Sequence, residues 1–339
     1  NGRNLTGIAL NDDEFRYVTE EKADSLGKAN AHRSDVVVTH RGTLGQISFI
    51  PETSKYERYV ISQSQFRFRC NEKVLPEYLT YYFHTRKGQY DLLSNASQVG
   101  VPALARATTT FQQLEVEIPD IVEQHKIVEI FENFRKKMEI NIKINNNLEQ
   151  QAQAIYQQMF IENQNSNWKE GKLSDLVAVK YGKDHKKLDG GCYPVYGSGG
   201  IMRYVEKPLY TGESVLIPRK GTLNNVMYVN GAFWSVDTMF YTEMLRPNIA
   251  KFVYHFVKGK DLASLNAGSA VPSMTTNILN AMPLYVPDDE TLSIFEETVT
   301  PMYSQMQENE KQSANLANIR DTLLPRLMSG ELDVSDIDL

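Results

Sequence analysis

Two long helical segments that repeat each other most constrain how this chain of 339 residues can fold. Residues 120–161 and residues 288–328 carry apolar side chains at alternating spacings of three and four, which is typical of the contact face of a coiled coil. A helix of about 40 residues is roughly 60 Å long, which exceeds the diameter of a small domain. We therefore expect two helices that act as spacers, with Asp120 and Asp288 as the residues that cap their starts.

The match between the two helices extends to their polar positions. An offset of 168 residues relates Ile127 to Phe295, Phe134 to Met302, Met138 to Met306 and Leu148 to Leu316. The same offset relates Asn141 to Asn309 and Asn145 to Ser313, and these polar residues interrupt the apolar face of each helix. Polar residues in such a face fix register at some cost in stability. The alternative is that each segment is an ordinary core helix of a separate domain, but the shared interruption favours paired helices.

A globular region rich in short strands precedes each helix, and the two regions also resemble each other. Arg41-Gly42-Thr43-Leu44 recurs as Lys220-Gly221-Thr222-Leu223. Each tetrapeptide lies between two apolar runs that indicate buried strands. The matching segments are strands at 36–38 and 215–217, strands at 47–50 and 226–229, short helices at 78–83 and 252–257, and last strands at 114–118 and 282–286. The sequence therefore predicts an α+β fold with two globular α/β regions and a pseudo-twofold internal repeat.

The repeat predicts six regions along the chain. They are a first globular region at 1–119, the first long helix at 120–161, a polar linker at 162–171, a second globular region at 172–287, the second long helix at 288–328 and a C-terminal tail at 329–339. The second globular region opens with residues 172–176 and a glycine-rich stretch at residues 190–200, and nothing before Arg41 resembles this opening. We therefore expect the first globular region to be N-terminally incomplete.

The net charge of −6 is distributed unevenly. Residues 169–287 have a net charge of +5, whereas residues 288–339 have a net charge of −9 and residues 1–119 are neutral overall. A basic globular region attracts phosphates, and an acidic helix is repelled by DNA. We therefore expect the second globular region to contact nucleic acid and the acidic helix surfaces to contact protein partners.

The composition indicates a cytoplasmic protein. No run of about 18 apolar residues is present, so the sequence predicts no transmembrane helix. Cys70 and Cys192 are far apart and form no C-x-x-C motif, which favours reduced thiols over a disulfide and excludes a zinc site made from cysteines.

Motifs that mark enzymes are absent from the sequence. It contains no H-E-x-x-H, no G-x-S-x-G, no dinucleotide fingerprint, and no Lys-Ser/Thr pair after a glycine-rich loop. The Asn/Asp-Pro-Pro-aromatic loop with which an N6-adenine methyltransferase would grip a flipped base is also missing. The six histidines have no ligand-like spacing, so they are better interpreted as structural or surface residues, and we expect neither catalytic nor metal-binding residues.

Polar side chains suited to DNA contact occur at predicted loop tips. A Lys or Arg beside a glycine can reach a phosphate or the O6 and N7 atoms of guanine, a neighbouring Thr can contact a phosphate or a thymine methyl group, and Asn can pair with adenine. The candidate DNA-binding residues are Arg41, Thr43, Lys183, His185, Lys186, Lys187, Tyr193, Tyr196, Ser198, Arg219, Lys220, Thr222, Asn224, Asn225, Ser273 and Thr275. Taken one at a time, a solvated surface residue is the simpler interpretation. The set as a whole, on a basic region, makes DNA contact a real alternative.

The chain resembles the DNA specificity (S) subunit of type I restriction-modification systems over essentially its whole length. The resemblance rests on the duplicated plan and on several phrases of the sequence. These are Lys172-Leu173-Ser174-Asp175-Leu176, Tyr193-Pro194-Val195-Tyr196-Gly197-Ser198-Gly199-Gly200, Pro218-Arg219-Lys220-Gly221, the starts of the helices at Pro119 and Pro287, and Leu323-Leu324-Pro325-Arg326-Leu327-Met328-Ser329-Gly330-Glu331-Leu332.

This resemblance implies a non-catalytic subunit with two target recognition domains, each of which reads one half of a bipartite DNA sequence. It also implies that the long helices pack antiparallel as a coiled coil and hold the two domains apart. The implied partners are double-stranded DNA, two methyltransferase (M) subunits and restriction/translocase (R) subunits, with no membrane. No cofactor is expected on this chain, and S-adenosylmethionine is implied in the methyltransferase subunits.

Two other classes of function remain as alternatives. One is a coiled-coil scaffold with two β-rich heads that binds no DNA, which would have no salt-dependent affinity for duplex DNA. The other is an enzyme that acts on carbohydrate or nucleic acid, which the lack of an acid pair or a metal-binding cluster disfavours.

Overall fold

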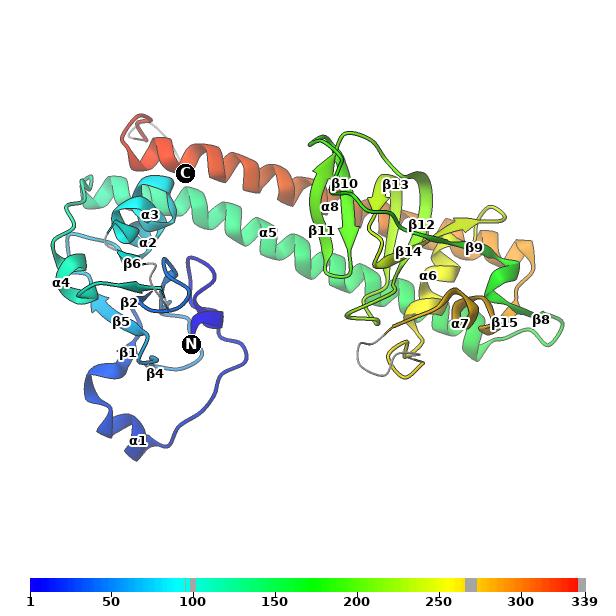
Figure 1. Ribbon diagram of the computed structural model, residues 1–339, viewed down its shortest axis with the longest axis horizontal. Coiled ribbons are helices and arrows are strands. Elements are labelled where there is room, and N and C mark those ends of the chain that lie inside the picture. Colours follow the sequence, from blue (N-terminus) through cyan, green and yellow to red (C-terminus); the bar gives the residue numbers. More distant parts are fainter. Residues whose placement is uncertain (95, 98–101, 266–272, 335–339) are drawn as a thin grey trace. The chain divides into compact units, whose positions relative to one another are not determined.

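The computed structural model describes residues 1–94, 96–97, 102–265 and 273–334. The chain divides into two compact units, the first formed by Asn1–Ile142 with Glu310–Leu339 and the second by Lys143–Asn309. Each unit contains one globular part and a stretch of both long helices, because the division crosses both of them (Figure 1).

The long helices are α5 (Ile121–Tyr156, 36 residues) and α8 (Asp289–Met328, 40 residues). A π-helical stretch, η3 (Gln157–Glu162), directly follows α5. The Asp120 carboxylate accepts a hydrogen bond from the backbone N–H of Glu123 at 2.9 Å, and Asp288 accepts one from Thr291 at 2.8 Å. These bonds satisfy N–H groups that have no partner within the helix, which explains why both helices start just after an Asp.

Within each unit, α5 and α8 pack against each other in opposite directions. In the first unit, Ile127 near the start of α5 shares a core cluster with Leu327 near the end of α8, and the Asn141 side chain donates to Ser313 Oγ at 3.1 Å. In the second unit, Asn309 donates to Asn145 Oδ1 at 2.8 Å. The four polar positions that interrupt the repeated apolar pattern therefore meet as two equivalent pairs.

The globular part of the first unit contains a three-stranded antiparallel sheet in the order β3-β2-β5, and its central strand β2 is buried along its whole length. Two smaller pairs, β1-β4 and β6-β7, complete its strands. The elements are η1 (Gly2–Asn4), α1 (Glu20–Ser25), η2 (Gly27–Ala29), β1 (Asn30–His32), β2 (Asp35–Thr39), β3 (Ile47–Phe49), β4 (Arg58–Val60), β5 (Gln65–Arg69), α2 (Pro76–His84), α3 (Arg86–Leu93), β6 (Ala96–Ser97), β7 (Ala103–Leu104) and α4 (Ala107–Gln112).

The globular part of the second unit is built on a six-stranded sheet in the order β11-β10-β13-β12-β14-β9, in which β10 and β13 pair in parallel and the other neighbours pair antiparallel. A separate antiparallel pair joins β15 to β8. The elements are β8 (Lys169–Lys172), η4 (Leu173–Asp175), β9 (Val177–Tyr181), β10 (Tyr193–Gly197), β11 (Gly200–Val205), β12 (Tyr210–Pro218), β13 (Met227–Ser235), β14 (Met239–Met244), α6 (Ala250–Lys258), α7 (Thr276–Asn280) and β15 (Pro283–Val286).

The internal repeat is visible in the sheets, because β3-β2-β5 of the first unit corresponds to β13-β12-β14 of the second. One expected strand is absent. Residues 114–118 follow α4 without forming a strand, whereas their counterpart β15 pairs with β8. A strand needs a neighbouring strand to bond its backbone, and within the part of the chain that the structure describes, the first unit has no segment equivalent to β8. The prediction of a strand at 114–118 was therefore wrong.

We predict that replacing the polar pair of the second unit by Asn145→Leu with Asn309→Leu stabilises the protein. The double variant buries apolar surface and removes both amides of the pair, and the exposed Gln305 side chain, which donates to Asn309 Oδ1 at 2.9 Å, can bond to water instead. The free energy of unfolding should therefore rise by about 1–2 kcal/mol. The single variant Asn309→Leu should gain less, because Asn145 Oδ1 loses its donor. Urea unfolding measures both, with the exposed Asn146→Leu as the control that should change little. A double variant that is less stable than the natural protein would contradict this account of the pair.

Candidate nucleic-acid interface

Several loops of the second unit, most of which connect strands of its six-stranded sheet, meet one another. They comprise residues 182–188, 197–200, 219–225, 236–238 and 273–275, which we call the loop face. The backbone N–H of Lys183 donates to the Ser235 carbonyl oxygen, and the N–H of Arg219 donates to the Thr238 carbonyl oxygen, each at 2.8 Å. The Asn225 side chain donates to the carbonyl oxygen of Ser198 at 2.6 Å. These contacts join segments that lie up to 52 positions apart in the sequence.

The repeated Arg/Lys-Gly-Thr-Leu turn has the same structure in both units. Lys220 forms an isolated antiparallel bridge to Ser273, and Arg41 forms the equivalent bridge to Ala103. The glycine after each basic residue has a positive φ, +87° at Gly221 and +90° at Gly42, which other residues adopt only with strain. The glycine therefore allows the chain to turn sharply while the basic side chain and the following Thr stay exposed.

The loop face carries cations that are free to meet phosphates. The side chains of Lys183, Lys186, Lys187 and Lys220 are exposed, and none of these ammonium groups has a carboxylate within 4 Å among the described residues. His185, within the same cluster, is half-buried. Exposed, unpaired lysines attract the DNA backbone without sequence preference.

Arg219 is held differently from the lysines. Its guanidinium group lies over the ring of Tyr181 at 5.3 Å from the ring centroid, and its Nη1 donates to the Asp237 carbonyl oxygen at 3.3 Å. A planar guanidinium stacked on an aromatic ring loses less freedom when it forms two parallel hydrogen bonds. The sequence interpretation missed Tyr181, which is half exposed, although an aromatic residue just before Gly182 and Lys183 was the available signal.

Several other candidate residues hold the loops in place. The Asn224 amide donates to Asp261 at 3.1 Å and accepts from the Ala263 N–H at 3.0 Å. Thr275 caps α7 by accepting from Ile278 N–H at 3.3 Å. Tyr193 and Tyr196 are half-buried and pack against the hydrophobic core of the sheet. Base contact by these side chains, or by Asn225, Ser198 and Ser273, stays a prediction that must accommodate their contacts within the protein.

In the first unit, Arg41 and Thr43 lie exposed on the equivalent turn, and the N–H of Gly42 donates to the Pro102 carbonyl oxygen at 2.9 Å. Arg67 and Arg69 share one face of β5, and both form ion pairs with the fully buried Asp35, at 3.3 Å and 2.8 Å. These two arginines therefore neutralise a buried carboxylate.

Two kinds of feature are absent from the described residues. No three His, Cys, Asp or Glu side chains of this part of the chain converge as metal ligands would. None of the described helices combines the length and the apolar surface that crossing a membrane requires.

Comparisons with known proteins agree on one family. The family model described as "Type I restriction modification DNA specificity domain" matches the chain twice, at residues 6–150 and 165–315. The chain is 20% identical to the type I restriction enzyme MjaIX specificity subunit of Methanocaldococcus jannaschii, over 95% of this chain and 83% of that protein. It is 24% identical to the HindI specificity subunit of Haemophilus influenzae, over 52% of this chain and 34% of that protein.

A solved structure with a similar fold is the S subunit of a type I restriction-modification system from M. genitalium. The TM-score is 0.54 at 20% sequence identity, and the match covers 89% of this chain and 84% of that one. The likeness supports the two-fold repeated architecture described above.

We predict that Gly221→Ala destabilises the second unit. At a φ of +87° an alanine is strained, so the free energy of unfolding should fall by about 1–2 kcal/mol. Gly199→Ala in the adjacent loop is the control, because an added Cβ there meets no atom within 4 Å. Equal effects of the two variants in urea unfolding would contradict the role of the positive φ.

Proposed function

The chain belongs to the family of type I restriction modification DNA specificity domains, and from this premise we propose that it is the DNA specificity subunit of a type I restriction-modification complex. The observation that carries the proposal is that the same family model matches both repeats. A specificity subunit is not an enzyme: it selects the DNA sequence, and other subunits methylate or cleave it.

In this proposal each globular part is a target recognition domain that reads one half of a bipartite DNA sequence. The support is the repeated turn, which presents Arg41 in one copy and Lys220 in the other at equivalent positions. In the second copy, the loop lysines would contact phosphates and fix the position of the domain. Arg219, supported by Tyr181, is the side chain best suited to pair with the O6 and N7 atoms of a guanine.

We also propose that α5 and α8 form one antiparallel coiled coil that acts as a ruler between the two recognition domains. The opposite directions of the helices and the polar pairs within each unit support this role. Helices of 36 and 40 residues are long enough to separate half-sites by about one DNA turn, roughly 34 Å.

The partners that this proposal requires are double-stranded DNA, two methyltransferase subunits that use S-adenosylmethionine, and restriction/translocase subunits, all in the cytoplasm. The net charge of −9 on residues 288–339 suits helix surfaces that contact protein. This chain itself would bind no cofactor.

We predict that Lys220→Gln weakens the affinity for duplex DNA and lowers the slope of log K against log salt by about 1, because one phosphate contact is lost. Fluorescence anisotropy at several salt concentrations, on the complex with the methyltransferase subunits, measures the slope. Lys311→Gln removes an exposed lysine of α8 outside the recognition domains and serves as the control. The proposal fails if the natural complex binds duplex DNA with no dependence on salt, which is the behaviour of a scaffold without a DNA role.

We predict that removing one heptad from α5 together with the facing heptad of α8 shortens the permitted spacer between the half-sites by about three base pairs. Seven helical residues correspond to roughly 10 Å, and each base pair rises about 3.4 Å. Selection from a duplex library with variable spacers measures this distance. A spacer that stays the same would show that the helices do not set it.

A further inference from the structure

Helix α6 connects the recognition sheet of the second unit to both long helices through polar side chains. It is buried along most of its length, although its polar residues Lys251, Tyr254, His255 and Lys258 include three that can carry charge. We call these four residues the α6 clamp. All of their partners described below lie within the second unit.

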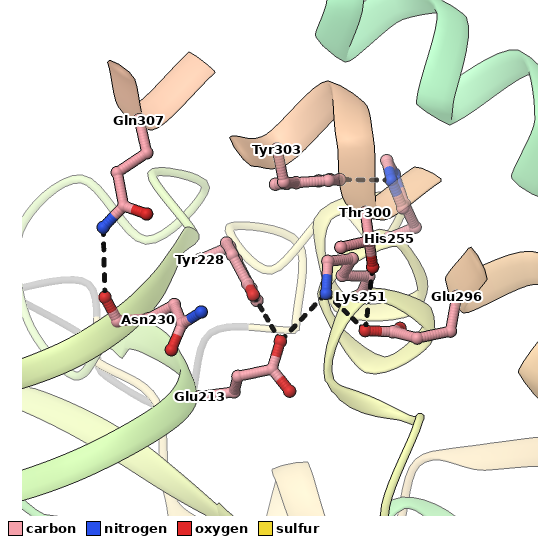
Figure 2. Close-up of polar contacts among 9 residues, drawn as sticks. All are labelled: Glu213, Tyr228, Asn230, Lys251, His255, Glu296, Thr300, Tyr303 and Gln307. Carbon is pink, nitrogen blue, oxygen red and sulfur yellow. Dashed lines mark hydrogen bonds and ion pairs between the residues drawn. The ribbon is translucent and has the colours of Figure 1, made fainter. Parts of the chain in front are cut away.

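Lys251 is the charged centre of the clamp. The residue is only 3% exposed, and its Nζ contacts Glu213 Oε1 of β12 at 2.9 Å and Glu296 Oε1 of α8 (Figure 2). Tyr228 donates a hydrogen bond to the same Glu213, and Lys251 Nζ lies 5.8 Å from the centroid of the Tyr303 ring of α8. The recognition sheet and α8 therefore share one buried ammonium group.

His255 bridges α6 to both long helices. Its Nδ1 lies 2.7 Å from Gln153 Oε1 of α5. Its Nε2 lies 2.9 Å from the Tyr303 hydroxyl of α8, the contact drawn in Figure 2. Burial lowers the pKa of His255 to about 4, so the ring is neutral near pH 7 and has one donor and one acceptor. Because the Gln153 oxygen can only accept, Nδ1 donates to it and Nε2 accepts from Tyr303.

The last turn of α6 is fixed to α5 by a third set of contacts. Tyr254 and Lys258 both donate to Glu149 Oε1 of α5, and Lys258 Nζ also lies 2.7 Å from the Tyr254 hydroxyl. These bonds hold the pKa of Glu149 below its usual range in spite of its burial. The clamp is thus bonded to two residues of α8, Glu296 and Tyr303, and to two residues of α5, Gln153 and Glu149.

The first unit attaches its recognition domain without such a clamp. Its α2 corresponds to α6, but the positions of Lys251 and Glu296 hold Glu77 and Val128. Glu77 has no basic partner within 4 Å among the described residues. The face of α2 is aromatic, and two hydrogen bonds connect it to α5: the Tyr81 hydroxyl donates to Glu132 at 3.2 Å, and the N–H of Leu75, just before α2, donates to Gln124 Oε1 at 2.9 Å.

The contacts of the clamp are better suited to fixing the orientation of the domain on the helices than to raising the stability of the fold. Buried ion pairs often add little stability compared with well-packed apolar residues, because desolvation offsets the attraction. Their hydrogen bonds are directional, however, so they are satisfied in one arrangement of the helices and the domain. The mainly aromatic contact of the first unit contains no buried cation among its described residues, and such packing tolerates small rotations more readily.

We propose that the α6 clamp is a positioning device that fixes the orientation of the second recognition domain on the two long helices, and that it thereby restricts the spacer lengths at which both half-sites are read. The proposal rests on the function proposed above. Lys251 and His255 are positioning residues, since they lie in the buried side of the domain and contact no candidate DNA-binding side chain.

The test measures spacer selectivity in the complex with the methyltransferase subunits. Duplexes that carry both natural half-sites with spacers differing by one base pair are methylated, and the modified adenines are sequenced. For Lys251→Met with Glu296→Gln, we expect the preference for the best spacer over its neighbours to fall by about tenfold, the effect of losing one directed charged interaction. The bases read in each half-site should stay the same.

The matched control is Arg326→Met with Glu331→Gln, which removes an exposed ion pair from the last turn of α8 and the tail and should leave spacer selectivity unchanged. A folded clamp variant with the natural selectivity overturns the proposal. Should the double variant fail to fold, Tyr303→Phe removes only the hydroxyl that bonds His255, and we expect a loss of about threefold. Unchanged spacer selectivity in Tyr303→Phe would also overturn the proposal. Tyr81→Phe, which removes a hydroxyl of the first unit, is the control, and we expect it to leave the selectivity unchanged. A natural complex that methylates no bipartite sequence would refute the proposed function itself.

Discussion

The antiparallel contact between α5 and α8 is the interaction on which the rest of this structure depends. Two apolar helix faces can slide past each other with little change in buried area, so apolar packing alone does not select a register. The pair Asn141–Ser313 in one unit and the pair Asn145–Asn309 in the other are satisfied only when these residues face each other. Within each unit the globular part shares its hydrophobic core with both helices, so the helix register sets which side chains the globular part packs against.

The two copies solve the same packing problem with different chemistry. In the first, the fully buried Ile127 and the ring of Phe131 meet an aromatic face of α2. In the second, the fully buried Phe295 lies beside His255, which bonds to both helices. The next residue, Glu296, pairs with the buried Lys251. Repeats that diverge in this way keep one fold while each globular part is attached by its own contacts, which suits the proposed reading of two different half-sites.

Sequence reasoning succeeded where a feature is local and repeated. The apolar spacing gave the two long helices, and the paired tetrapeptides gave turns that Gly42 and Gly221 make possible. It failed where the local structure, or the contact that a side chain makes, depends on a residue from elsewhere in the chain. Residues 114–118 have the pattern of a strand but lack the second strand that β8 supplies to their counterpart. The Asn224 amide bonds to Asp261, a distant residue that no local pattern indicates.

Mapping of methylated adenines in host DNA, with and without this protein, tests the central claim most directly. The account predicts one bipartite motif with a constant spacer that disappears when the protein is removed, because the proposed coiled coil would hold the two recognition domains at a fixed distance. A continuous motif, a variable spacer, or a motif that persists without the protein would contradict it.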